Sequence, residues 1–367
     1  MVKRIKTIML VLMVIVSKGG FSFNDASFTD KISSFVRMQM EKDHTPGVVV
    51  LVSSPKIGIK RLAFGQAELS PHQQKMTDDL NFRVASISKT FLAVMILKMI
   101  EQGKIERFAG IAQYLPKDID RSQIPNLELI TVQDLLRMSS GIPEYYDLDV
   151  DEYLAAYPYK QWLPRDALRF STDLGPKFMP GKGYHYSNTN YVLLQLILRQ
   201  VTGKKIAQNL QEIICAPLGL KNTFADDFKM SPFTLTTKGY DMKRKVIDVS
   251  GHDDGFGVGD TFVITTANDL NTFLQALFLH KTLLTSNALN MMLSVNPYGG
   301  YGMGVEINPL TSWGLVYSHN GLVNGYQSNY FYLPQAQLTV IIFTNNRSTQ
   351  LIEPVFLNIL NTYREKI

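Results

Sequence analysis

Residues 81–103 read NFRVASISKTFLAVMILKMIEQG, and this stretch decides how the rest of the chain is interpreted. From Thr90 to Ile100 nearly every residue is apolar, and the run is too long for an ordinary strand. Gly103 follows the run and is a typical residue to end a helix. The pattern predicts a helix that is apolar on all sides and is therefore buried.

The first turn of this helix carries Ser86, Ser88 and Lys89. Residues three apart share a helix face, so the Lys89 amine is expected near the Ser86 hydroxyl. A serine becomes a good nucleophile when a neighbour takes its proton, and burial favours the neutral, basic form of lysine. The helix N-terminus adds N–H groups suited to an oxyanion. The spacing predicts a nucleophile with its base; the alternative is Ser86 as an N-cap beside a solvated Lys89.

The same Ser-x-x-Lys spacing occurs a second time, from Ser53 to Lys56. There the serine ends a β-branched run, and Pro55 and Gly58 mark a turn. The spacing alone is therefore a weak signal. The long buried helix distinguishes the match at Ser86.

The N-terminus reads as a secretory signal peptide over residues 1–22. Lys3, Arg4 and Lys6 precede an apolar run from Ile8 to Val16, which is short for a membrane span. An uncleaved N-terminal anchor is the alternative, and it would be the chain's one contact with a membrane. Removal of the segment would leave residues 23–367 as the mature protein.

Charge and cysteine content exclude several classes of protein. The net charge is +5, but residues 1–22 hold four basic residues and no acidic one, so the remainder is near +1. This balance gives no reason to expect nucleic-acid binding. Cys215 is the single cysteine, which excludes an intramolecular disulfide. Export without disulfides favours a bacterial periplasm.

Strand-like segments lie at both ends of the chain, and helical segments lie between them. Residues 48–53 and 59–67 predict a hairpin, and further strands are expected at 315–318, 325–333 and 337–344, with a turn at Gly321. Helices are expected at residues 26–42, 130–137, 164–170, 188–202, 206–214, 266–278 and 352–363.

This order predicts an α+β fold. Both chain ends, about residues 23–85 and 295–367, are expected to form one antiparallel sheet flanked by the terminal helices. Residues from about 104 to 290 are expected to form a mostly helical lobe. The Ser86 helix would lie at the seam between them, a usual place for a ligand site.

Two further polar groups are candidates for chemistry. Tyr186-Ser187-Asn188 precedes an apolar helix, where the tyrosine could relay protons and the amide could orient a lysine or a carbonyl. The alternative is an aromatic loop with Asn188 as an N-cap. His319-Asn320-Gly321 follows a strand near the C-terminus, where backbone and imidazole could hold a substrate; the alternative is a polar turn.

Together the three groups resemble the motifs of the serine penicillin-recognising enzymes. They are most similar to the branch with class C β-lactamases and D-alanyl-D-alanine carboxypeptidases, which also holds esterases and aminopeptidases. Further stretches are similar to that branch, over about residues 46–346. They are Leu135–Pro143, Phe178–Leu194, Ala216–Leu220 and the Gly-rich stretch from Gly257 to Leu270.

The resemblance implies a β-lactamase/transpeptidase-like fold and an acyl-enzyme on Ser86, with no metal or organic cofactor. It implies that Lys89 and Tyr186 share the general base and acid work, and that Asn188 holds Lys89 and the substrate amide. The backbone N–H groups of Ser86 and Leu322 would form the oxyanion hole. Substrate binding would fall to five residues: Asn188, His319, Asn320, Gly321 and Leu322.

One departure affects the expected substrate. Asn320 stands where this branch often has a hydroxyl residue that helps to hold a carboxylate, which weakens the case for penicillin and D-Ala-D-Ala as natural substrates. His319 favours the carboxypeptidase or esterase side over a dedicated β-lactamase. We expect first a D-Ala-D-Ala carboxypeptidase-like or related peptidase that acts on peptidoglycan-type peptides. The alternatives are an esterase or β-lactamase on small acyl substrates and a non-catalytic cell-wall scaffold.

Overall fold

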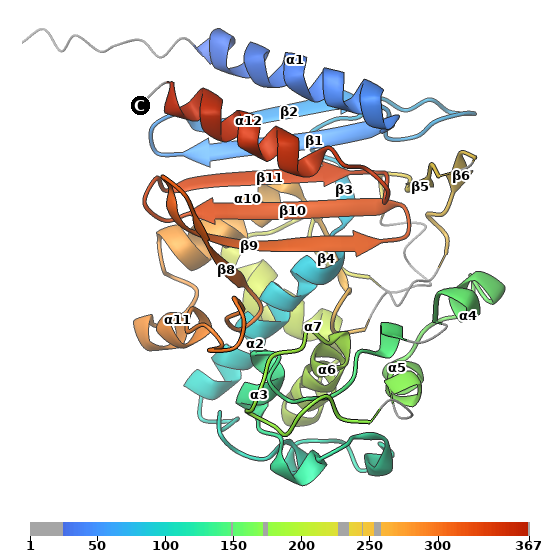
Figure 1. Cartoon of the computed structure of the whole chain (residues 1–367), viewed down its shortest axis with the longest axis vertical. Helices are drawn as coiled ribbons and strands as arrows, with labels where there is room; N and C mark the ends of the chain where they lie inside the picture. Colours follow the sequence, from blue (N-terminus) through green and yellow to red (C-terminus); the bar gives the residue numbers. More distant parts are fainter. Residues whose placement is uncertain are drawn as a thin grey trace, which may run out of the picture.

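A six-stranded antiparallel sheet built from both ends of the chain dominates the structure (Figure 1). The computed structural model describes residues 25–147, 150–171, 175–226, 235–243, 245–252 and 258–365. The strand order is β2-β1-β11-β10-β9-β8, so β1 pairs with the last strand of the chain. In that pair Val48 lies opposite Thr344. The strands are β1 (Gly47–Ser54), β2 (Gly58–Gly65), β8 (Glu306–Leu310), β9 (Gly314–Val323), β10 (Tyr326–Leu333) and β11 (Leu338–Thr344).

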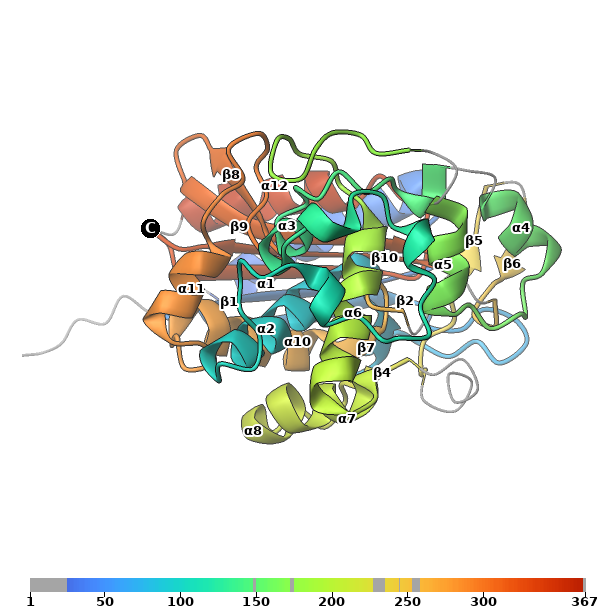
Figure 2. The ribbon, with the colours of Figure 1, turned by 90° about the horizontal axis from the view of Figure 1, so that it is seen from below.

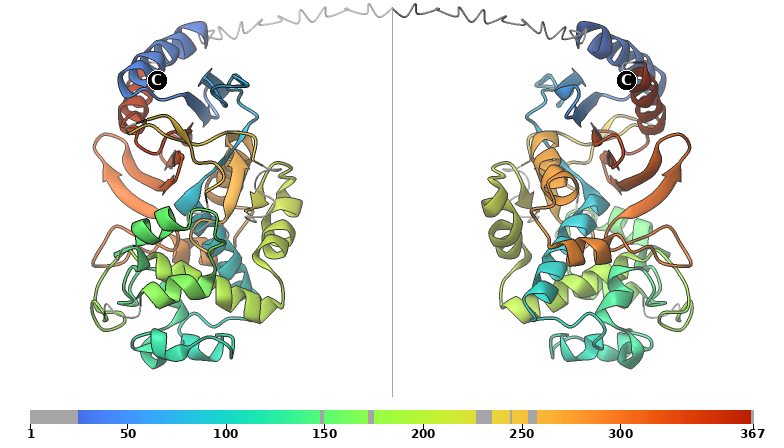
Figure 3. Two further views of the ribbon diagram at one scale, coloured as in Figure 1. Left: turned by 90° about the vertical axis from the view of Figure 1, so that its right-hand side faces the viewer. Right: turned by 90° about the vertical axis from the view of Figure 1, so that its left-hand side faces the viewer.

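Both faces of the sheet are covered, which explains why β1 is buried along its whole length and apolar from Val48 to Val52. Val48 and Val50 point to one face, where they pack with α1 (Asp25–Asp43) and α12 (Ile352–Arg364). Val49 and Leu51 point to the other face and join the main core around α2 (Ser88–Glu101). The side views show α1 and α12 together on the outer side of the sheet (Figure 3).

The helical lobe lies against the inner face of the sheet, which is the face that packs on α2. Seen from below, α6 (Asn188–Thr202) crosses the lobe, with α2 behind it (Figure 2). The other α-helices among the described residues are α3 (Val132–Leu136), α4 (Val150–Ala156), α5 (Pro164–Ser171), α7 (Ile206–Leu210), α8 (Ala216–Leu218), α10 (Ala267–Leu274) and α11 (Ser286–Met292).

A small second sheet leads the chain into α2. Its order is β3-β7-β4, from β3 (Asn81–Arg83), β7 (Val263–Thr266) and β4 (Phe224–Ala225). Arg83 ends β3 inside the protein, where its Nε lies 2.8 Å from Asp226 Oδ2 and its Nη1 donates to the Ser250 carbonyl at 2.6 Å. Both partners of this ion pair are at most 1% exposed. The pair fixes the strand that immediately precedes Ser86.

The structure confirms the predicted fold class and most of the predicted elements. The helix at residues 188–202 has the predicted bounds, with Gly203 in the left-handed region. The helix expected at residues 130–137 is α3, which Thr131 caps through a capping box with Asp134. Cys215, the single cysteine, is buried.

Some element predictions were wrong or incomplete. The expected turn at Gly321 does not occur, because β9 continues to Val323 and the chain turns at residues 324–325. The strands β3, β4, β5 (Tyr240–Asp241), β6 (Ile247–Asp248), β7 and β8 were not predicted, and neither were helices α4 and α11.

The helices expected at residues 206–214 and 266–278 are confirmed. Each contains one wider π turn, at Gln211–Cys215 and at Gln275–Leu279.

The expected signal peptide lies outside the described residues, as does the start of the Gly-rich stretch at Gly257. Among the helices that the structure describes, none combines the length and the apolarity needed to cross a bilayer.

The buried ion pair gives a stability prediction. Arg83→Ala leaves the Asp226 carboxylate buried without its guanidinium, so we expect about 3–5 kcal/mol of destabilisation in urea unfolding. The double change Arg83→Met with Asp226→Leu removes both charges and should recover most of that loss. An Arg83→Ala protein as stable as the parent would contradict the assigned role of the pair.

Candidate active site

Ser86 lies in a tight 3-10 turn, Ala85–Ile87, which runs directly into α2. Lys89 is on the first turn of α2, and its Nζ donates to Ser86 Oγ at 2.8 Å. Lys89 is fully buried, whereas Ser86 is partly exposed. The predicted juxtaposition is therefore present. The alternative of an N-cap serine beside a solvated lysine does not hold, because the helix has no side-chain cap and Lys89 is enclosed.

Neighbouring strands hold the serine turn from both sides. Ala85 has a φ of +48°, an uncommon conformation for a residue with a side chain. The Val84 N–H donates to the Val263 carbonyl at 3.1 Å, and the Val263 N–H donates to Ser88 Oγ at 2.9 Å. Ser328 of β10 donates to the Val84 carbonyl at 2.9 Å. These bonds fix the backbone that presents Ser86.

Burial sets the protonation of Lys89. Removal from water lowers its pKa to about 8, while the carboxylates of Asp260 and Glu144 act in the opposite direction. Its Nζ also donates to the Asp260 carbonyl at 3.3 Å and lies 5.2 Å from the centre of the Tyr186 ring. A substantial fraction of Lys89 is therefore neutral near pH 8 and available to accept the Ser86 proton.

Tyr186 faces the same serine from the other side. Burial raises the pKa of its phenol well above the ordinary value, and a hydrogen bond with Ser86 only partly opposes this. The phenol therefore keeps its proton at neutral pH. Lys89 and Tyr186 thus meet at Ser86 with opposite capacities, the amine to accept a proton and the phenol to donate one.

Two buried carboxylates line the inner side of this group. Glu144 accepts hydrogen bonds from the backbone N–H groups of Asn188, at 2.5 Å, and Tyr146, at 3.0 Å. It therefore neutralises the N-terminal end of α6. Burial nevertheless raises its pKa to about 7. Asp260 accepts a hydrogen bond from the Tyr145 hydroxyl at 3.1 Å.

Asn188 begins α6 beside this group. Its side-chain Oδ1 is buried and has no hydrogen-bond partner among the described residues. An orphaned buried acceptor is uncommon in folded proteins. It leaves an amide oxygen available for a donor that arrives with a substrate.

His319 is buried and neutral. Its Nδ1 lies 2.8 Å from the Asn320 carbonyl and its Nε2 lies 3.0 Å from the Tyr301 hydroxyl, so both ring nitrogens have partners. Burial and the charge of Lys89 lower the pKa of the imidazole to about 3. His319 therefore supplies no positive charge at neutral pH for a substrate carboxylate.

Strand β9 passes directly beside the serine turn. A Cβ atom at Gly321 would lie 2.1 Å from the Val84 carbonyl oxygen, so only glycine permits this approach. β8 pairs with β9 only from Gly314 to Ser318, so the edge of β9 beyond Ser318 is unpaired by β8. Leu322 lies on this free stretch, with its side chain 46% exposed.

The structure does not bring the Asn320 side chain to the other site residues. Successive side chains of a strand point to opposite faces, and His319 points inward to Tyr301. Asn320 instead lines a cavity on the outer face, together with Phe331 and with Phe356 of α12. Asn320 therefore does not face the site, contrary to the prediction, and His319 is the residue of this pair that points towards it.

Four residues of this site were not predicted: Glu144, Tyr145, Asp260 and Tyr301. Glu144 directly follows the Leu135–Pro143 stretch, and Asp260 lies within the Gly-rich stretch, so proximity to these motifs was the available signal. Tyr301 lies in an irregular segment and carries no such signal. Among the described residues, no cluster of three or more His, Cys, Asp or Glu side chains could hold a metal ion.

The buried Lys89 gives a second prediction. A pKa lowered from 10.5 to about 8 means that burying this ammonium costs at most about 3 kcal/mol below pH 8. Lys89→Met removes that cost, and it also removes the bonds to Ser86 and Asp260. We expect a net gain of about 1–2 kcal/mol at pH 6.

The gain should shrink as the pH rises from 8 towards 10.5, because the parent lysine is then neutral in both folded and unfolded chains. Urea unfolding at several pH values measures it. Lys98→Met, on the same helix but partly exposed, is the control and should shift stability by less than about 0.5 kcal/mol. A loss of stability for Lys89→Met at pH 6 would show that the ammonium is well compensated.

Comparison with known proteins agrees with this geometry. Residues 32–355 match the beta-lactamase family. The chain is 26% identical over 340 residues to a penicillin-binding protein of Bacillus subtilis (strain 168), covering 86% of this chain and 72% of that protein.

Solved structures show the same fold. A D-amino acid amidase from Ochrobactrum anthropi SV3 superposes with a TM-score of 0.79 at 22% identity, covering 92% of this chain and 99% of that one. A D-stereospecific amidohydrolase from Streptomyces gives 0.74 at 24% identity, covering 89% and 97%. With the family match over most of its length, the chain belongs to the beta-lactamase family and is a serine hydrolase of that family.

Proposed function

We propose that this hydrolase cleaves amide and ester bonds in small peptide-like substrates of D-amino acids, through an acyl-enzyme on Ser86. The observation that carries the proposal is the 2.8 Å contact between Lys89 Nζ and Ser86 Oγ inside a buried site. The D-amino acid amidase and the D-stereospecific amidohydrolase with the same fold support the substrate class.

The protonation states suggest how the first half of the reaction proceeds. Ser86 Oγ attacks the acyl carbon while neutral Lys89 takes the hydroxyl proton. The backbone N–H groups of Ser86 and Leu322 would hold the resulting oxyanion. Tyr186, protonated at neutral pH, donates a proton to the departing amine as the carbon–nitrogen bond breaks.

Water completes the cycle. It attacks the ester carbon of the acyl-enzyme and gives up a proton to the Tyr186 phenolate that the first half left. Protonated Lys89 returns its proton to Ser86 Oγ as the ester bond breaks. The products are the free acid and the regenerated serine. If the acyl-enzyme is hydrolysed rapidly, the protein turns its substrate over. If it is hydrolysed slowly, a penicillin stays bound to Ser86 and inactivates the protein.

The neutral His319 favours substrates that have no carboxylate on the leaving side. A peptide ending in D-Ala-D-Ala brings such a carboxylate, and an amide or an ester does not. This observation supports an amidase or esterase as the leading candidate over the carboxypeptidase. The carboxypeptidase remains the second candidate, supported by the penicillin-binding relative.

We further propose that the chain acts outside the cytoplasm, where fragments of peptidoglycan would be a source of D-amino acid substrates. The proposal rests on the charge and hydropathy pattern of residues 1–22 alone. A mature protein whose measured mass still includes these residues would contradict cleavage.

Mass spectrometry tests the nucleophile. The protein exposed to an aryl ester or a penicillin should gain the acyl mass on the peptide that contains Ser86, and Ser86→Ala should abolish the adduct. Ser53→Ala is the matched control, because Ser53 has the same spacing to Lys56 but lies in β1. An adduct that survives in Ser86→Ala would exclude the proposed nucleophile, and silence with both reagents would favour the scaffold.

A matched pair of substrates tests the leaving side. We expect an N-acyl-D-alanyl-D-alanine amide to be hydrolysed at least about tenfold faster than the corresponding free acid, by kcat/KM, since His319 carries no charge to compensate the carboxylate. The pair differs only at the C-terminus. A tenfold preference for the free acid would establish the carboxypeptidase instead.

A further inference from the structure

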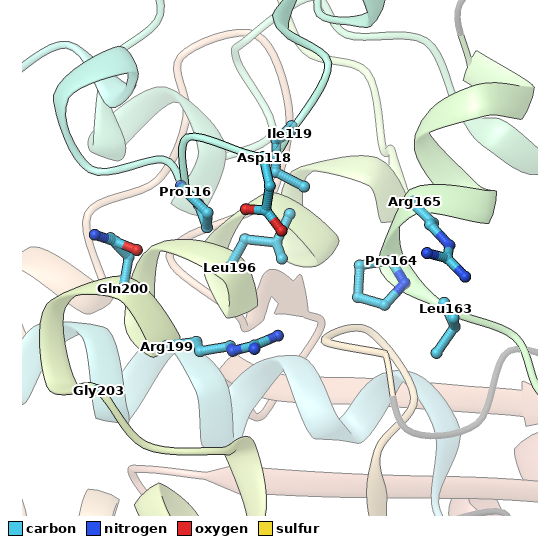
Figure 4. A pocket seen from close by; sticks show the side chains of 10 residues that line it. All are labelled: Pro116, Asp118, Ile119, Leu163, Pro164, Arg165, Leu196, Arg199, Gln200 and Gly203. Atoms are coloured by element: carbon cyan, nitrogen blue, oxygen red, sulfur yellow. The ribbon is translucent and has the colours of Figure 1, made fainter.

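A second cavity lies in the helical lobe, away from Ser86. Its volume is about 550 Å³, within the range of small-molecule sites. It is bounded by the loop at residues 116–119, by the start of α5 and by the last turns of α6 (Figure 4). None of the residues placed in the active site lines it. Nothing in the proposed reaction uses this space.

Three charged side chains reach this cavity from three different segments. Arg165 comes from α5, Arg199 from α6, and Asp118 from the loop (Figure 4). All three are exposed, and none forms an ion pair with any other residue that the structure describes. Arg199 also lies in the last turn of α6, where a cation favours the helix dipole. That effect does not account for Arg165 and Asp118 on the facing walls.

Apolar side chains also line this cavity. Leu163 and Pro164 lie on one wall and Leu196 on another, and Leu196 is only 5% exposed. A cavity that combines apolar side chains with convergent charged groups can hold a small ligand that has both kinds of surface. A guanidinium group suits a carboxylate because its planar donors match both carboxylate oxygens. Asp118 offers a matching acceptor for an ammonium group.

We infer that this cavity binds a small zwitterionic peptide, with its carboxylate held by Arg165 and Arg199 and its ammonium held by Asp118. A cavity of about 550 Å³ has room for a dipeptide with its side chains against Leu163 and Leu196. The inference does not depend on the proposed reaction.

The two sites are separate but share one helix. Asn188 begins α6 at the active site, and Arg199 follows eleven residues later, which corresponds to about 16 Å along the helix. A ligand in the second cavity would therefore leave the space above Ser86 open.

Isothermal titration of L-alanyl-L-alanine into the full-length Ser86→Ala protein tests the site. We expect saturable binding that weakens at least about tenfold in the double variant Arg165→Gln with Arg199→Gln. Arg37→Gln, on α1 at the outer side of the sheet, is the matched control and should bind as the parent does. Absence of saturable binding, or equal binding by the double variant, would overturn the inference.

Two changes at the ammonium end test the zwitterion. N-acetylation of the dipeptide should weaken its binding to the Ser86→Ala protein about tenfold. Adding Asp118→Asn to that protein should weaken binding of the free dipeptide but not of its acetylated form. Equal affinity of both ligands for the parent would overturn the role of Asp118. Because binding is measured with Ser86 replaced, these outcomes are independent of whether the protein hydrolyses D-amino acid substrates.

Discussion

The whole site depends on keeping one lysine out of water. Lys89 points from the first turn of an apolar helix towards Ser86, and its enclosure lowers the pKa of the amine to about 8. An exposed lysine would remain charged and could not accept the serine proton. The negative charges of Asp260 and Glu144 act in the opposite direction and raise the pKa of this amine. The apolar sequence of α2 is therefore a catalytic requirement as much as a packing requirement.

Contacts with distant strands also hold the serine in place. Ala85 takes a left-handed backbone conformation, and bonds from β7 and β10 hold the residues on either side. Gly321 brings β9 onto the Val84 carbonyl, at a distance that any larger residue would prevent. The nucleophile is thus presented by contacts with strands that lie far away in the sequence.

Features set by local pattern could be predicted from the sequence, whereas features set by tertiary contact were missed. The apolar sequence of residues 188–202 located α6 to the residue, and the Ser-x-x-Lys spacing located the central pair. The turn expected at Gly321 was wrong because a glycine among polar residues usually marks a turn, whereas here it serves close strand packing. The neutral state of His319 depends on burial and on the nearby charge of Lys89, which local sequence does not report.

The pairing of β1 with β11 has a consequence for how the chain reaches its active form. Val48 and Thr344 face each other, so the centre of the sheet closes only after nearly the entire polypeptide is available. Such long-range strand pairing raises contact order and slows folding, because the loop-closure entropy must be overcome first. A partly synthesised chain therefore has Ser86 and Lys89 but lacks β9 and β10 beside them. Its hydrolytic centre forms at the final stage of folding, so incomplete chains stay inactive.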